Sequence, residues 1–203
     1  MDTYPRYNDS LIDTRIAQFF SESRSGQIYL RLCEQQGEPC VIDHITIRCL
    51  NIDEEAKPFL AKGYSYQDEL VEYPDQGWWA KVYRHPSFPT LFIDQAYDDK
   101  RGEKSIIPAW VRRFGSNVLH HVAVLVTDID KTVKWMRDIG GEFSGEVVGA
   151  RGTRLRQIFT AAEVRDNAPF TVLELTERNG YAGFYPEQAN RLMESSVTKQ
   201  SGP

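Results

Sequence analysis

The 203-residue sequence has little cysteine, and the cysteines that it has form no metal or disulfide pattern. The three cysteines, an odd number, have no CxxC spacing; they are Cys33, Cys40 and Cys49. They therefore predict neither a disulfide framework nor a thiolate zinc site. This cysteine usage is typical of a reducing compartment, and we expect a cytoplasmic location.

Long apolar runs are also missing from the sequence. No run approaches the roughly 20 residues that a helix needs to cross a bilayer. The N-terminal segment MDTYPRYNDS lacks both the basic region and the apolar region of a secretory signal. We therefore expect a protein that neither associates with a membrane nor follows the standard export route.

The sequence has no excess of positive charge. Its 24 Lys and Arg residues are outnumbered by 29 Asp and Glu residues, which gives a formal net charge of −5. Surfaces that bind nucleic acids depend on clustered Lys and Arg. The basic clusters here are short and typical of solvated surface: Arg112–Arg113, and Arg151 with Arg154 and Arg156. We expect a small-molecule partner and no nucleic acid.

What the sequence does contain is an internal repeat. Segment 41–53, VIDHITIRCLNID, matches segment 118–130, VLHHVAVLVTDID, with a shift of 77 positions that places His44 on His121 and Asp53 on Asp130. An alternating apolar run that ends in an Asn or Asp helix-start signal predicts a strand followed by a helix. Two copies predict two similar modules that share one site.

Turn and breaker residues divide each module into one strand, one helix and three further strands. In the first module these are a strand at Val41–Leu50, a helix at Glu54–Lys62 and strands near 67–71, 78–84 and 90–95. In the second module they are a strand from Leu119, a helix at about 129–139 and strands near 142–148, 154–160 and 169–176.

Helical segments are expected to flank the two modules. Apolar residues at helical spacing predict a helix over Ser10–Ser23, and Gln27–Gln36 is expected to form a short helix or an extended piece. A covering helix is expected at Glu187–Ser195, before a frayed end at 197–203. The expected organisation is an N-terminal helical extension at 1–40, modules at 41–97 and 118–178, a linker at 98–117, and a C-terminal covering helix and tail at 179–203.

Polar residues of the predicted strands converge on one face. The ends of the two modules align with a shift of 80, which places Asp94 opposite Glu174. Alternate residues of a strand share a face, so Glu174 points away from its apolar neighbours, and His44 shares a face with Arg48. Together with His121, these residues predict a concave surface with two imidazoles and one or two carboxylates.

The two imidazoles and the carboxylate indicate a metal site. Two histidines and one carboxylate leave open positions on a metal and suit Fe(II) that must bind a chelating substrate and dioxygen. Zinc, manganese and nickel accept the same ligands. A lone histidine at a strand start is more often structural, but the equivalence of His44 and His121 in the repeat favours ligands. His120 should point to the opposite face by strand parity, and we expect it to be structural.

The motifs resemble those of the vicinal oxygen chelate superfamily over about residues 41–195. The segments LHHVAVLVTDIDKTVKWMRDIGGEF, LRQIFT and TVLELTERNGYAGF are similar to the catalytic domain of the 4-hydroxyphenylpyruvate dioxygenases. The segments DHITIRC and WWAKVYRHPSFPTLFID resemble the 2-oxoadipate dioxygenase/decarboxylase family. The resemblance implies an α+β fold in which two tandem βαβββ modules form a half-open mixed β-barrel around a metal site, with flanking helices.

The resemblance also implies a site and an activity. His44, His121 and Glu174 would hold Fe(II), Arg48 would hold a substrate carboxylate, and Gln157 would lie near the substrate. The implied enzyme is a monomer or homodimer that oxidatively decarboxylates a small 2-oxo acid with dioxygen. The chain lacks the additional N-terminal domain of the hydroxyphenylpyruvate enzymes and is shorter than typical oxoadipate enzymes, so the substrate itself does not carry over.

Two alternatives remain open from the sequence. A glyoxalase-like lyase or isomerase would use a divalent metal without oxygen, and Asp94 as a fourth ligand would distinguish it. A non-catalytic protein of the bleomycin-resistance type would bind a small molecule in a similar fold without any metal.

Overall fold

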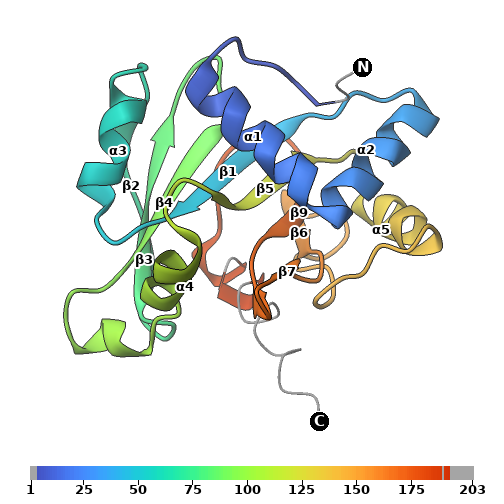
Figure 1. The fold of residues 1–203 in the computed structure, drawn as a ribbon. Helices are drawn as coiled ribbons and strands as arrows, with labels where there is room; N and C mark the ends of the chain where they lie inside the picture. The colour runs from blue at the N-terminus through green and yellow to red at the C-terminus, as the bar shows by residue number, and fades with distance from the viewer. Residues whose placement is uncertain (1–3, 189, 193–203) are drawn as a thin grey trace.

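The computed structural model describes residues 4–188 and 190–192 and begins with two helices, α1 (Ser10–Glu22) and α2 (Arg24–Gln36) (Figure 1). The Asp9 carboxylate accepts hydrogen bonds from the first backbone N–H groups of α1. Ser23 ends α1, and its hydroxyl caps α2. The first predicted helix is therefore confirmed, and the second segment is a helix and not an extended piece.

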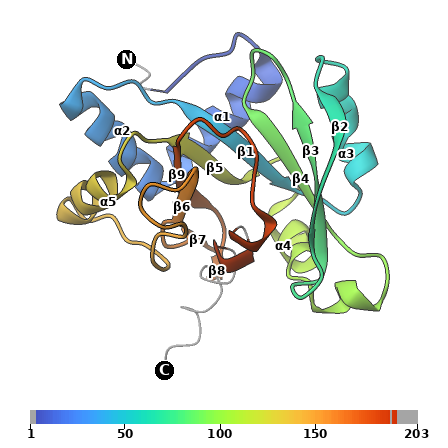
Figure 2. The ribbon, with the colours of Figure 1, turned by 180° about the vertical axis from the view of Figure 1, so that it is seen from behind.

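Seven strands form one curled mixed sheet in the order β2-β3-β4-β1-β5-β9-β6 (Figures 1 and 2). The strands are β1 (Ile42–Arg48), β2 (Ser65–Tyr73), β3 (Trp78–Arg84), β4 (Thr90–Ala96), β5 (Leu119–Leu125), β6 (Leu155–Phe159) and β9 (Val172–Arg178). The two repeated strands, β1 and β5, pair antiparallel at the centre, and each pairs in parallel with the last strand of its own module. The predicted α+β half-barrel is confirmed.

The repeat also governs the helices that follow its two strands. Helix α3 (Ile52–Leu60) begins after Asn51, and helix α5 (Ile129–Asp138) begins after Asp128, the equivalent position of the second module. Each capping side chain accepts a hydrogen bond from a backbone N–H in the first turn of its helix. The helix-start signals of the repeat therefore act as predicted.

One predicted strand of the second module is absent from the described residues. Segment 142–148 makes only two isolated bridges, Phe143 to Thr160 and Val148 to Gln157. Gly149 ends it with φ +98°, where a Cβ would lie 2.4 Å from the Leu155 carbonyl oxygen. A small hairpin that the pattern does not predict, β7 (Val164–Arg165) with β8 (Ala168–Pro169), follows β6.

The two faces of the sheet carry different cores. Helices α1, α2, α3 and α5 cover the outer face, where alternate strand residues such as Ile45, Val122 and Leu173 are fully buried. Helix α4 (Ile107–Phe114), which follows the 3-10 helix η1 (Lys100–Lys104), packs with the aromatic residues of the inner face. The polar residues of β1, β5 and β9 therefore point into the half-barrel.

The last described residues approach this inner face. Residues 186–188 and 190–192 are helical, and Leu192 is buried against the inner core. The rest of the predicted covering helix and the predicted frayed end lie outside the described residues. Among the described helices, none has the length and apolar character required to cross a bilayer.

Candidate metal centre

Three neighbouring strands bring His44, His121 and Glu174 together inside the half-barrel. Thr46 of β1 lies opposite His121 of β5, and Ala123 of β5 lies opposite Glu174 of β9. The Nε2 atoms of the two histidines are 3.2 Å apart, and the Oε2 atom of Glu174 lies 3.4 Å from His44 Nε2 and 3.6 Å from His121 Nε2. All three residues are buried.

These distances fit one face of a coordination polyhedron. With metal–ligand bonds of about 2.1 Å, two ligands lie about 3.0 Å apart at a right angle and about 3.4 Å apart at a tetrahedral angle. The three donor atoms of the site form a triangle of nearly that size. In the described part of the chain, no other group of three or more His, Cys, Asp or Glu side chains converges in this way. The residues present therefore fit a divalent metal ion.

The second oxygen of Glu174 is held by two polar side chains. Gln157 Nε2 of β6 donates to Glu174 Oε1 over 2.7 Å, and Thr176 Oγ1 lies 2.6 Å from the same oxygen. These bonds turn Oε2 toward the histidines. The structure thus places Gln157 in the site, where its amide group contacts the carboxylate.

His44 is oriented by a half-buried ion pair that the sequence pattern does not reveal. Its Nδ1 lies 2.8 Å from Asp43 Oδ2, and Arg178 binds both oxygens of Asp43. Consecutive strand residues normally point to opposite faces, but the pairing of β1 with β5 is irregular between Ile42 and His44. The only hint in the sequence is the acid that directly precedes the histidine in DHITIR.

The charges around His44 act in opposite directions on its pKa. Burial lowers this pKa, but the negative charge of Glu174 and the hydrogen bond to Asp43 outweigh burial and raise it to about 9. Burial also opposes ionisation of Asp43, yet the bonds from His44 and Arg178 lower its pKa. In the absence of metal, the cluster therefore holds a proton on His44 between two carboxylates.

His121 differs from His44 in being neutral. Burial lowers the pKa of His121 to about 3, although Glu174 opposes the shift. The Thr46 hydroxyl lies 2.8 Å from its Nε2, and His120 Nδ1 lies 3.1 Å from its Nδ1. A hydroxyl that donates to Nε2 leaves the ring proton on Nδ1, which is also the tautomer that a metal at Nε2 requires.

The expectation that His120 points to the opposite face is wrong. Thr46 pairs with His121, but the next residue, Ile47, pairs with Leu119, so His120 is an extra residue in β5. Such a bulge interrupts the alternation of side chains. The His120 ring therefore lies beside His121 and packs edge-on against Trp110.

Arg48 and Asp94 face each other across β1 and β4 but differ in what they line. Asp94 lies in the wall of the pocket around His44, His121 and Glu174, here called the metal pocket, but it is not one of the three donors. Burial raises the pKa of Asp94 to about 7, although the charge of Arg48 opposes this shift. Burial lowers the pKa of Arg48 to about 10, although Asp94 opposes the shift. Arg48 lines a neighbouring cavity and not the metal pocket.

The pocket around the three donors is small and largely apolar. Its volume is about 40 Å³, and its walls include Phe92, Phe159 and Phe184. The Phe184 ring packs edge-on against both His44 and Phe92, with centroid distances of 5.2 and 4.6 Å. Phe184 belongs to the segment after β9, so the C-terminal part of the chain closes the site.

Comparison with known proteins supports the fold at low sequence identity. No family model matches the sequence, and no curated protein matches it significantly. The hydroxyglutarate synthase of Oryza sativa, solved with 2-oxoadipate, matches with a TM-score of 0.74 and 17% identity over 94% of this chain and 92% of that chain. A 4-hydroxymandelate synthase mutant of Streptomyces coelicolor matches with a TM-score of 0.64 and 21% identity over 80% of this chain and 56% of that chain.

A third matching protein has a superfamily name in its description. A protein of Ralstonia eutropha JMP134, described as a glyoxalase superfamily protein, matches with a TM-score of 0.66 and 13% identity. The match covers 91% of this chain and 90% of that chain. The chain therefore has the glyoxalase, or vicinal oxygen chelate, fold that its sequence motifs suggest.

Proposed function

We propose that the protein is a divalent-metal enzyme, and that it uses Fe(II) and dioxygen to decarboxylate a small 2-oxo acid oxidatively. The observation that carries the proposal is the buried triangle of His44 Nε2, His121 Nε2 and Glu174 Oε2. Three protein ligands on one side of a metal leave the other side open for a chelating substrate and for dioxygen. When bound, Fe(II) would supply these open positions and the electrons that activate dioxygen.

The residues around the triangle supply geometry and exclude water. Gln157 and Thr176 fix the carboxylate of Glu174, and Asp43 fixes the ring of His44. Hydrogen bonds of this kind orient metal ligands and hold the ring nitrogens in one tautomer. The aromatic wall keeps bulk water from a reactive centre.

Arg48 is our candidate for binding a carboxylate of the substrate. Its guanidinium suits two-point binding of a carboxylate. The side chain lies four residues beyond His44 on β1, and its charge acts on Asp94 in the wall of the metal pocket. A 2-oxo acid bound at the metal would meet this charge only if it extended toward the end of β1.

The name of one solved structure with this fold suggested this class of reaction to us. The Oryza sativa structure pairs the name hydroxyglutarate synthase with bound 2-oxoadipate. Passage from 2-oxoadipate to hydroxyglutarate removes one carbon as carbon dioxide and balances when one molecule of dioxygen is consumed. We extend only the reaction class to this chain, because the likeness to that enzyme is one of fold.

The test is anaerobic reconstitution with Fe(II), followed by oxygen-consumption assays against 2-oxo acids that include 2-oxoadipate and 4-hydroxyphenylpyruvate. We expect one molecule of carbon dioxide for each molecule of oxygen consumed with at least one substrate. Protein loaded with Zn(II) should consume none. Bound Fe(II) without oxygen uptake for any 2-oxo acid would overturn the dioxygenase assignment.

Asp94 supports a second candidate, a lyase or isomerase of the glyoxalase type. It is a buried carboxylate in the same pocket, and no side-chain hydrogen bond to it is found among the described residues. Metal-dependent conversion of a 2-oxo aldehyde thiol adduct without oxygen uptake would favour this candidate. If purified protein binds no divalent metal, both enzyme proposals fail in favour of a non-catalytic binding protein.

A further inference from the structure

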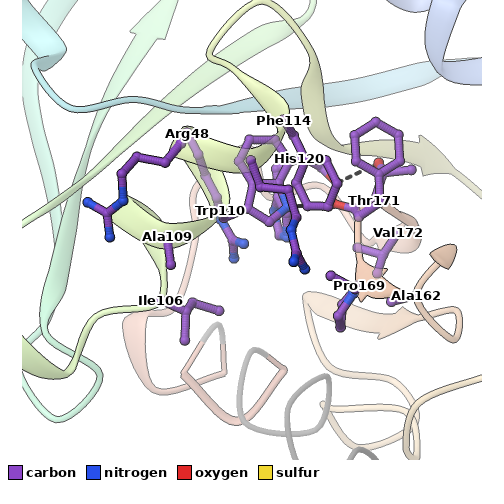
Figure 3. Close-up of a pocket in the computed structure, with 14 residues that line it drawn as sticks. Arg48, Ile106, Ala109, Trp110, Phe114, His120, Ala162, Pro169, Thr171 and Val172 are labelled. Carbon is purple, nitrogen blue, oxygen red and sulfur yellow. Dashed lines mark hydrogen bonds between the residues drawn. The ribbon is translucent and has the colours of Figure 1, made fainter. Parts of the chain in front are cut away.

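A second and larger cavity lies under helix α4, next to the metal pocket (Figure 3). Its volume is about 460 Å³, within the range of about 300–1,000 Å³ that is usual for small-molecule sites. Arg48 and Ile106 lie on one side of it, and Ala162 and Pro169 on the other. The cavity shares no lining residue with the metal pocket.

The charged groups that line this cavity are all cationic. Arg48, Arg112 and Arg113 contribute guanidinium groups, and no Asp or Glu of the described chain lines it. Arg112 and Arg113 are exposed residues in the last turn of α4, and Arg48 comes from the end of β1. Asp94 faces Arg48 from outside the cavity, so Arg112 and Arg113 add positive charge that no carboxylate of the cavity wall balances, and this favours an anionic ligand.

Arg48 provides an independent indication of a ligand. Only 3% of its surface is exposed, and its Nε atom has no hydrogen-bond partner. Leaving a charged donor buried and unpaired is unfavourable. Its guanidinium carbon also lies 5.5 Å from the centre of the Trp110 ring, which holds the side chain at the cavity wall. A carboxylate or phosphate in the cavity would compensate the positive charge of this guanidinium.

Aromatic rings form the apolar part of the wall. Trp110 packs against Phe114 and lies parallel to Phe170 at centroid distances of 5.3 and 6.2 Å. The indole Nε1 donates to the Phe170 carbonyl oxygen over 2.8 Å, which fixes the plane of the Trp110 ring. A fixed aromatic wall beside three cations suits a flat or short apolar body that carries a negative group.

We propose that the cavity under α4 is a binding site for an organic anion, namely a carboxylate or a phosphate monoester on a small apolar or aromatic body. The site is built from α4, the end of β1, the start of β5 and the segment 168–172. It does not depend on a metal, because none of the three candidate metal ligands lines it. His120 lines the cavity and touches His121, so the two sites adjoin through neighbouring histidines.

The first test is calorimetric titration of the protein in EDTA with benzoate, phenyl phosphate and the neutral analogue benzamide. We expect at least one anion to bind more than ten times as tightly as benzamide and to quench the tryptophan fluorescence of the protein. The stronger of the two anions identifies the carboxylate or the phosphate as the preferred group. Equal binding of all three compounds, or no binding at millimolar concentration, overturns the proposal.

The second test separates a built site from general charge attraction. The double variant Arg112→Gln/Arg113→Gln changes exposed residues and spares buried Arg48, so it should fold. Its matched control is Arg31→Gln/Arg154→Gln, which removes the same charge at exposed positions away from the cavity. We expect at least a tenfold loss of affinity in the first variant and less than a twofold loss in the control. Equal losses would overturn the proposal.

A final titration tests whether the anion site binds part of a substrate that is bound at the metal. The same titration is repeated on protein saturated with Zn(II) and with the 2-oxo acid that the oxygen-consumption assays identify as a substrate. Competition would show that the cavity takes the far end of a substrate bound at the metal, whereas unchanged affinity would show a separate ligand. Both results require the anion site, and because the titrations in EDTA involve no metal, they stand even if the metal enzyme proposal fails.

Discussion

The Nδ1 atoms of His120 and His121 lie 3.1 Å apart, although the two residues are neighbours in one strand. The bulge in β5 turns both rings to the inner face. A metal at His121 Nε2 leaves the ring proton on Nδ1, which then donates to His120. His120 is therefore a positioning residue for the candidate ligand next to it.

We expect His120→Ala to weaken metal binding about 10- to 100-fold, the usual effect of losing such a hydrogen-bond partner. His120→Asn should recover part of this loss, because its side-chain oxygen can accept from Nδ1–H. Affinity is measured by Zn(II) titration against a competing chelator, with His85→Ala in an outer turn as the control. Wild-type affinity in His120→Ala would show that the contact is only packing.

The convergence of His44, His121 and Glu174 could be predicted from the sequence because it depends on strand alternation and on the repeat. Strand parity orients His44 and Glu174 to one face, and the repeat aligns His44 with His121. The placement of these side chains requires only regular strands and the pairing of two similar modules. The structure brings all three together on that basis.

Other parts of the site depend on pairing between distant segments, and for that reason they could not be predicted. The bulge at His120 exists only in register with β1, and the ion pair of Asp43 with Arg178 joins residues 135 positions apart. The cavity beyond Arg48 exists because α4, which lies in the segment expected to be a linker, packs over the end of β1.

Asp94 and Glu174 should differ sharply in their effect on the metal. Glu174→Gln removes a candidate ligand charge, and we expect a loss of metal affinity of at least 100-fold. Asp94→Asn should retain affinity within a few-fold, because Asp94 lies outside the three-donor group. Zn(II) titration of both variants measures the two metal affinities. A comparable loss in Asp94→Asn would indicate four protein ligands and favour the lyase candidate.

Removal of the Gln157 amide should loosen the carboxylate that it holds. Gln157→Leu leaves Glu174 Oε1 with the Thr176 hydroxyl alone, and a lost hydrogen bond to a buried charge costs about 1–3 kcal/mol. Urea denaturation in EDTA should show this loss in the free energy of unfolding. Gln18→Leu, at a half-buried position of α1 whose hydrogen bond to Glu22 is exposed, is the control and should stay within about 0.5 kcal/mol of the wild type. A Gln157→Leu protein as stable as the control would contradict the role assigned to this bond.

The stability of the metal-free protein should depend on the protonation of His44. Burial lowers the pKa of His44, but the charge of Glu174 and the bond to Asp43 raise it from 6.5 to about 9. A pKa raised on folding stabilises the protein fully below pH about 6.5, and the stabilisation is lost as the pH rises to about 9. Relative to His44→Gln, the wild type in EDTA should lose up to about 3 kcal/mol over this window.

Urea denaturation of both proteins at several pH values measures this difference. Zn(II) should act in the opposite direction, because imidazole binds metals in its deprotonated form and metal affinity therefore rises with pH. A difference between wild type and His44→Gln that stays constant from pH 6.5 to 9 would rule out the protonated cluster.

Phe184 should control access to the metal pocket. The pocket volume of about 40 Å³ is far below the roughly 300–1,000 Å³ of usual small-molecule sites, so we expect a wall to move when a 2-oxo acid binds. Most of the wall belongs to the sheet, whereas Phe184 lies on the segment after β9, and its ring packs against His44 and Phe92. We expect Phe184→Ala to speed the removal of bound Zn(II) by EDTA at least fivefold, measured by stopped-flow with a zinc indicator. Phe88→Ala, which removes a half-buried ring on another part of the surface, should leave the rate unchanged. If both variants release zinc at the wild-type rate, the route to the metal does not pass Phe184.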